Sequence, residues 1–146
     1  MQIALASDHA GFAYKERLRQ LLQEAGHQVQ DHGAYSEESS DYPDFAVSAA
    51  QAVARGEADY GILICGTGIG VSIVANKIAG VRAANCCTEE MARLSRQHND
   101  ANVLTVGARL LPFEQVWRIV EVFLTTPFEG GRHARRVEKI HRLTGR

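Results

Sequence analysis

The residues best suited to chemistry stand in the run A-D-Y-G-I-L-I-C-G-T-G-I-G, which extends from Ala58 to Gly70. Its apolar part, Tyr60 to Cys65, predicts a strand that is buried on both faces. Three glycines then alternate with Thr67 and Ile69, and Val71 to Lys77 is compatible with a helix. A strand, a glycine-rich turn and a helix in this order leave main-chain N–H groups unpaired near the positive end of the helix, which favours an anion. The sequence therefore predicts an anion site with a thiol at its edge.

A thiol in this position is a candidate nucleophile or base. The positive end of a helix stabilises a thiolate, which can act as a base near neutral pH. Taken alone, Cys65 is a weak signal, because most buried cysteines are packing residues, and glycines can simply tighten a strand–helix turn. The turn matches neither common nucleotide motif, since Val71 occupies the last position of G-x-G-x-x-G and no Gly-Lys-Ser/Thr follows. Together, the thiol and the glycine turn predict a base beside an anion hole.

Further polar residues follow other predicted strands. Asp8 and His9 come directly after a buried strand over Gln2–Ser7, and Asn85 ends a strand that begins at Val81. Ligands of open parallel sheets bind beyond the carboxyl ends of the strands. We expect these side chains at the same edge of the sheet as the thiol.

Other ionisable residues have two interpretations. His98, and likewise His9, is typical of an exposed histidine when taken alone, and Arg109 of a solvated charge. Arg132 and Arg136 are four residues apart, so they share one side of a helix. The remaining histidines show no ligand spacing, so the sequence predicts no metal; they are His27, His32, His133 and His141.

Strands and helices alternate along the chain. The predicted strands are Gln2–Ser7, Val29–His32, Tyr60–Cys65, Val81–Asn85 and Asn102–Val106. Helical patterns follow each strand, including one that Pro43 opens and one that Thr88 caps ahead of Glu89 and Glu90. Five such alternations with short connections predict an α/β fold: a three-layer, doubly wound, five-stranded parallel sheet of Rossmann-like type.

Size and charge narrow the class of protein. The 146 residues, 45% of them hydrophobic, fit a single domain over 1–146. The net charge of −1, and a basic segment from Arg132 to Arg146 that is short and lacks aromatic residues, predict no nucleic-acid partner. No signal pattern or spanning apolar run predicts a membrane partner, and three cysteines without metal spacing favour a reduced, cytoplasmic protein. Residues 128–146 follow a complete five-strand unit, so we expect this extension and its helix to dock on a partner subunit.

Six motifs along the chain carry a family resemblance. They are Asp8-His9-Ala10-Gly11, Asp41-Tyr42-Pro43, Cys65-Gly66-Thr67-Gly68-Ile69-Gly70, Ala75-Asn76-Lys77, Ser95-Arg96-Gln97-His98-Asn99-Asp100 and Glu129-Gly130-Gly131-Arg132-His133. In this order they resemble the type B ribose-5-phosphate isomerases, whose wider family includes allose- and galactose-6-phosphate isomerases. The match runs from about Ile3 to Val137.

The resemblance implies an aldose–ketose isomerase that interconverts D-ribose 5-phosphate and D-ribulose 5-phosphate through a cis-enediolate. It implies a small phosphosugar substrate and neither metal nor cofactor. It also implies a homodimer, or a tetramer, whose sites are shared across the dimer interface.

The resemblance also implies roles for particular residues. Cys65 would move the proton between C2 and C1; one branch of the family uses a glutamate at the position of Val71 instead, so this chain resembles the cysteine branch. His98 and Thr67 would open the furanose ring. The implied substrate-binding residues hold sugar hydroxyls, the oxyanion or the phosphate: Asp8, His9, Tyr42, Gly66, Gly68, Ile69, Gly70, Asn99, Arg109, Arg132 and Arg136.

Two other functions stay open at this point. A hexose-6-phosphate isomerase, for allose or galactose 6-phosphate, would carry the same motifs. A non-catalytic phosphosugar-binding module is less consistent with the presence of base, anion hole and ring-opening histidine together. The galactose-specific branch works as a pair of unlike subunits, whereas a chain with the complete set suits a homomer. Cys86 and Cys87 are interpreted as buried packing residues.

Overall fold

The computed structural model describes residues 1–146 and contains one five-stranded sheet in which every pairing is parallel. The strands are β1 (Gln2–Ser7), β2 (Gln28–Asp31), β3 (Tyr60–Cys65), β4 (Ala83–Asn85) and β5 (Val103–Gly107). Their order across the sheet is β2-β1-β3-β5-β4. The chain therefore changes direction across the sheet between β1 and β3, which is where ligands of such sheets bind.

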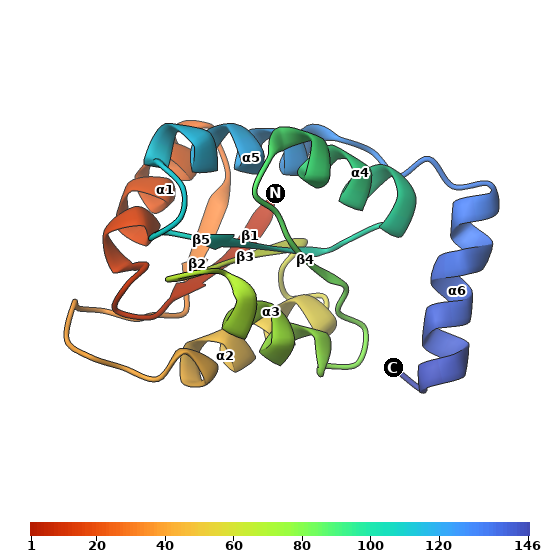
Figure 1. The fold of residues 1–146 in the computed structure, drawn as a ribbon, viewed down its shortest axis with the longest axis horizontal. Coiled ribbons are helices and arrows are strands. Elements are labelled where there is room, and N and C mark those ends of the chain that lie inside the picture. Colours follow the sequence, from red (N-terminus) through yellow and green to blue (C-terminus); the bar gives the residue numbers. More distant parts are fainter.

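Helices cover both faces of the sheet, as Figure 1 shows, which confirms the predicted three-layer fold. One face carries α1 (Phe12–Glu24), α4 (Glu89–Asn99) and α5 (Phe113–Thr125), and the other carries α2 (Tyr42–Ala54) and α3 (Ile69–Asn76). Successive strand residues point to opposite faces, so each face has its own apolar core. In β3 the Cys65 side chain belongs to the core under α2 and α3.

Two helix starts agree with the sequence signals. The Met91 main-chain N–H donates to Thr88 Oγ1 at 3.1 Å, and Glu89 and Glu90 lie in the first turn of α4. Pro43 lies in the first turn of α2, where its missing N–H costs no helical hydrogen bond.

The predicted strand over Val81–Asn85 is too long at its start. The Val81 N–H donates to the Ile78 carbonyl, and the Arg82 N–H donates to Asn102 Oδ1 at 2.8 Å. Because neither N–H group pairs with a strand of the sheet, only Ala83–Asn85 joins the sheet as β4. The position of β5 between β3 and β4 was not predicted.

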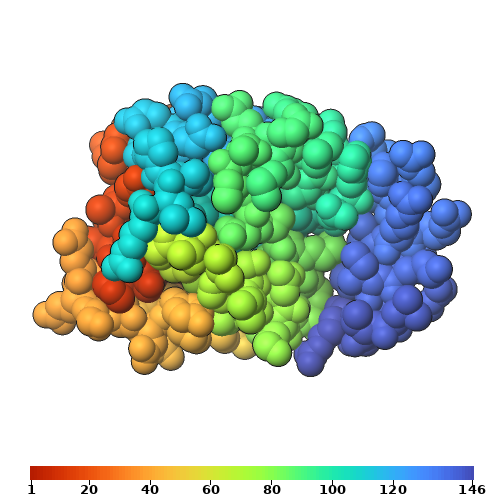
Figure 2. All heavy atoms as spheres, viewed as in Figure 1, coloured from red at the N-terminus to blue at the C-terminus, as the bar shows by residue number.

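The last helix, α6 (Arg132–Thr144), lies at one end of the molecule, outside the three layers (Figures 1 and 2). Among the other elements it packs mainly against α4. Val137 is buried in that contact, whereas Ile140 and Leu143 are exposed. An apolar helix side without a partner in the chain is consistent with the expected docking on a second subunit, which stays a prediction. No helix is long and apolar enough to span a membrane.

Candidate active site

The thiol of Cys65 lies at the carboxyl end of β3, directly before the glycine turn. The side chain is 5% exposed, and its Sγ accepts a hydrogen bond from the main-chain N–H of Gly68 at 3.2 Å. The amino terminus of α3 begins one residue later, at Ile69. The sulfur therefore lies beside the start of α3, where the sequence places the thiol.

Several main-chain N–H groups beside the sulfur are free to bind an anion. The N–H of Gly68 is used by the sulfur, and that of Ile69 donates to Thr67 Oγ1 at 3.2 Å. The N–H groups of the neighbouring residues donate to no group of the chain; they belong to Gly66, Thr67, Gly70 and Val71. The N–H groups of Gly68 and Ile69 are therefore already used within the chain. The Val71 N–H, which was not predicted as a donor, is available.

Close packing fixes the shape of the turn. Gly68 has a φ of 79°, a value that residues with a side chain rarely adopt. A Cβ at Gly107 would lie 2.7 Å from the carbonyl carbon and oxygen of Thr67, so β5 supports the turn directly. Gly107 was not predicted from the sequence, because its contact depends on β5 lying next to β3.

Predicted substrate-binding residues from other parts of the chain lie near this turn. The Tyr42 ring lies against Gly70, where a Cβ would be 2.6 Å from Tyr42 Cε1. The Arg109 guanidinium lies against Gly66, with Nη1 3.5 Å from the position of a Cβ there. Asp8 is buried, and its Oδ1 accepts from the Gly11 N–H at 3.1 Å.

His9 has a defined tautomer at the same edge. The ring Nδ1 of His9 accepts a hydrogen bond from the main-chain N–H of Ser40 at 3.1 Å, and the main-chain N–H of His9 donates to Ser40 Oγ at 3.2 Å. An Nδ1 that accepts a hydrogen bond leaves the proton of the neutral ring on Nε2. His9 can therefore donate from Nε2 to an anion. Ser40 was not predicted, because it lies in the long loop before α2.

The remaining predicted residues form a second group at the opposite end of the sheet. His98 and Asn99 end α4, which runs back from the carboxyl end of β4 to the amino end of β5. Arg132 and Arg136 are exposed on α6, which packs against α4. One chain therefore does not bring His98 together with Cys65.

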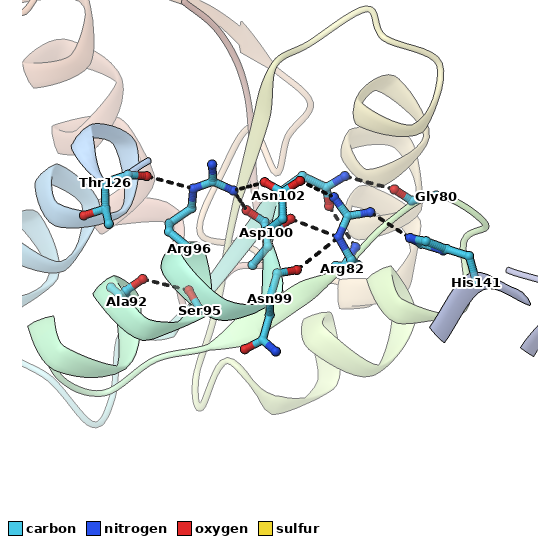
Figure 3. A network of polar contacts seen from close by, with 11 residues as sticks. Gly80, Arg82, Ala92, Ser95, Arg96, Asn99, Asp100, Asn102, Thr126 and His141 are labelled. Carbon is cyan, nitrogen blue, oxygen red and sulfur yellow. Dashed lines mark hydrogen bonds and ion pairs between the residues drawn. The ribbon is translucent and has the colours of Figure 1, made fainter. Parts of the chain in front are cut away.

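A polar network anchors this second group (Figure 3). Asp100 ends α4 with a φ of 47°, and its carboxylate accepts from Arg96 at 2.8 Å and from Arg82 at 3.5 Å. Arg82 also donates to the Asn99 carbonyl at 3.3 Å and to His141 Nε2 on α6 at 3.1 Å. Burial lowers the pKa of Arg82, and the Asp100 charge opposes that shift. Figure 3 shows the Asn99 side chain pointing away from the network, where it is free to bind a ligand.

His98 has close neighbours that the sequence did not indicate. Its ring stacks on the His133 ring with centroids 4.3 Å apart, and its Nε2 lies 3.5 Å from Glu129 Oε1. The pKa of His133 lies below its ordinary value, because desolvation disfavours the charged ring and because His98 and Arg132 repel a positive charge.

The cavities of the chain lie away from the thiol. The largest near a predicted residue, about 380 Å³, lies between α6 and the body and is lined by Arg82, Asn99, Ile140 and His141 among others. None of the four cavities is lined by Cys65, Asp8 or Tyr42.

A doubly wound parallel sheet, with a thiol and a glycine turn at the carboxyl end of its middle strand, defines an α/β protein of Rossmann-like fold. The family model for Ribose/Galactose Isomerase matches residues 3–140, so the chain belongs to this family and is an isomerase. The predicted membership is confirmed.

Relatives agree over nearly the whole chain. Ribose-5-phosphate isomerase B of Escherichia coli (strain K12) is 51% identical over 139 residues, covering 95% of this chain and 93% of the relative. The structure of Clostridium thermocellum ribose-5-phosphate isomerase B has a TM-score of 0.98 at 48% identity and covers 99% of this chain and 98% of that one. The structure of the Mycoplasma genitalium enzyme with bound ribulose-5-phosphate has a TM-score of 0.95 at 44% identity and covers 99% and 96%.

Proposed function

We propose that the chain interconverts D-ribose 5-phosphate and D-ribulose 5-phosphate, in an active site that two copies of the chain build together. The observation that carries this proposal is the Cys65 sulfur, held by the Gly68 N–H at 3.2 Å beside four unpaired main-chain N–H groups. The names of the relatives at 51% and 48% identity support the choice of substrate.

The proton transfer uses the sulfur twice. The Cys65 thiolate removes the proton from C2 of the open-chain aldose, and the electron pair moves to the carbonyl oxygen to give a cis-enediolate. The thiol then returns the proton to C1, while one proton passes between the two oxygens. Main-chain N–H groups of the turn stabilise the oxyanion, and one such donor is typically worth about 10²–10³ in rate. A positioned base adds about 10²–10⁴.

Ring opening requires a second acid–base group, which we assign to His98 of the second copy with Thr67 opposite. One group protonates the ring oxygen while the other takes the proton of the anomeric hydroxyl. His98 lies at the far end of its own sheet from Cys65, so only another copy can present it to this sulfur.

Substrate binding is likewise divided between the Cys65 end of one copy and the His98 end of the other. Asp8 and Tyr42 hold sugar hydroxyls from the thiol side, and Asn99 does so from the second copy. The phosphate is remote from the reacting bonds, so its ligands serve orientation; they are His9, Arg109, Arg132 and Arg136. Arginine suits this role because its planar fork can donate two parallel hydrogen bonds. The three free cysteines are consistent with the cytoplasmic location that we propose.

Parallel turnover assays test the proposal against its alternatives. The purified protein, with chelator present, is given ribose 5-phosphate, allose 6-phosphate and galactose 6-phosphate at equal concentrations. We expect the highest kcat/KM on ribose 5-phosphate. A higher value on either hexose phosphate would make the chain a hexose-6-phosphate isomerase, and binding without turnover of all three would make it a binding module.

A further inference from the structure

His98 lies in a cluster with Glu129 and His133, two residues that have no role in the proposed isomerase reaction. Their ligand atoms, two imidazole nitrogens and a carboxylate oxygen, all lie within 4.8 Å of one another. They come from three segments: the last turn of α4, the loop after α5 and the first turn of α6. The rest of the chain has no other group of three histidine, cysteine or acidic residues this close.

The main chain holds the three segments together. The Glu129 N–H donates to the Gln97 carbonyl at 3.1 Å, which fixes the loop against the end of α4 next to His98. Gly130 and Gly131 both have positive φ values, 71° and 57°, and the His133 N–H donates to the Gly130 carbonyl. This turn brings His133 back onto His98, where the two rings stack at 4.3 Å with an interplanar angle of 10°.

Two imidazoles and one carboxylate suit a transition-metal ion. This set binds Zn²⁺, with bonds of about 2.0–2.2 Å, and leaves a fourth position open. Around a tetrahedral ion of that size the ligand atoms are about 3.3–3.5 Å apart. His98 Nε2 and Glu129 Oε1 already have this separation, at 3.5 Å, and both side chains are more than 40% exposed. The His133 and His98 rings are stacked in parallel planes, so the His133 ring must rotate out of the stack to complete the set.

We propose that His98, Glu129 and His133 form a binding site for Zn²⁺ or a similar divalent transition-metal ion, and that the bound ion inhibits the enzyme. The inhibitory part rests on the proposed function, because an ion on His98 Nε2 removes the group that opens the sugar ring. Arg132 lies next to His133 and repels a cation. The site therefore suits an ion that binds reversibly rather than a resident cofactor.

Metal binding is tested first, without any assay of turnover. The full chain without a histidine tag is titrated with Co²⁺, and the visible absorption of the bound ion is recorded. We expect one Co²⁺ per chain, displaced by Zn²⁺, and a loss of affinity of at least about tenfold in His133→Ala and in Glu129→Gln, because each removes one of three ligands. His27→Gln, which changes a histidine beside the amino terminus, is the matched control. Equal Co²⁺ binding by wild type and His133→Ala would overturn the site.

Inhibition is tested second, on the same variants. Neither His133 nor Glu129 belongs to the proposed catalytic groups, so both variants should retain turnover in the presence of chelator. Zn²⁺ should inhibit the wild type reversibly. The free Zn²⁺ concentration that halves turnover should be at least about tenfold higher for His133→Ala. Equal inhibition of both would place the inhibitory ion elsewhere, for example on the Cys65 sulfur. Metal binding that leaves turnover of ribose 5-phosphate unchanged would overturn the inhibitory part and also the ring-opening role of His98, while the metal site would stand.

Discussion

The three cysteines of this chain differ in what surrounds their sulfurs. Cys65 accepts a main-chain hydrogen bond at a helix amino terminus, whereas Cys86 lies in the apolar core on the other face of the sheet. Burial raises the pKa of Cys86 to about 11. Cys87 is exposed, so its prediction as a buried residue was wrong, whereas that of Cys86 is confirmed. The three identical side chains therefore have different surroundings, which their positions in the fold determine.

Replacing Cys65 by alanine should abolish turnover and leave the fold intact, because the small side chain removes only the base from the end of β3. We expect kcat on ribose 5-phosphate to fall by at least about 10²–10³. Circular dichroism and binding of the phosphosugar, measured on the same protein, should change little. Near-wild-type turnover would rule out the sulfur as the base.

Replacing His98 by asparagine should separate ring opening from proton transfer. Turnover of cyclic substrate should fall by about 10², while an acyclic substrate should lose far less, since its carbonyl is already free. Steady-state kinetics on both substrates give the comparison. Equal losses on the two would refute the assignment.

The raised pKa of Cys86 predicts a pH dependence of stability. The folded chain keeps the thiol proton at a pH where the unfolded chain, with a pKa near 9.0, has lost it. The free energy of unfolding should therefore fall as the pH rises from about 9 to about 11, by on the order of 2 kcal/mol from this group. Urea unfolding of wild type and Cys86→Ala at several pH values isolates the contribution of the Cys86 thiol to the free energy of unfolding. The stability difference between the two should decline across this range; a constant difference would contradict the prediction.

At the scale of the elements, the shape of the glycine turn after β3 depends on its neighbours. The turn between β3 and α3 rests on the end of β5, because Gly107 has no side chain to displace Thr67. Tyr42 covers Gly70 from the first turn of α2. Three elements that are distant in sequence thus determine where the free N–H groups point.

Gly107→Ala should disturb this turn. The new Cβ would lie 2.7–2.8 Å from main-chain atoms of Thr67, so the turn must shift. We expect a loss of about 1–3 kcal/mol in the free energy of unfolding together with a lower kcat. Gly61→Ala is the matched control, because its Cβ would meet only valine side chains, 3.2 Å away, in the interior of β3. It should lower stability without lowering kcat. A Gly107→Ala enzyme with normal kcat would show that β5 does not determine the geometry of the turn.

At the scale of the whole molecule, the two groups of site residues lie at opposite ends of one sheet. Helix α4 runs antiparallel to the strands, so a residue at its end cannot reach the carboxyl end of β3. Two copies in opposite orientation would place the His98 end of each chain over the sulfur of the other. The exposed Ile140 and Leu143 on α6 suit contact with such a partner.

Mixing two inactive variants tests this arrangement. Cys65→Ala and His98→Asn chains are unfolded together and refolded, and turnover is compared with each variant alone. If each site combines Cys65 of one copy with His98 of the other, a mixed dimer has one intact site, and random pairing restores about a quarter of wild-type activity. A site within one chain would give no recovery.

The sequence by itself determined the layers, the parallel sheet and the position of the thiol at a helix amino terminus. These features follow from local signals: buried strands read as apolar runs, and glycines and caps mark the ends of helices. Tertiary structure decided what depends on strand order and on the turns between distant segments. The placement of β5 beside β3 put Gly107 under the glycine turn, and the fold of Glu129–Gly131 brought His133 onto His98. The direction of α4 also separated His98 from Cys65. Cys65 lies at the carboxyl end of β3, whereas His98 lies just before the amino end of β5, at the opposite end of the sheet.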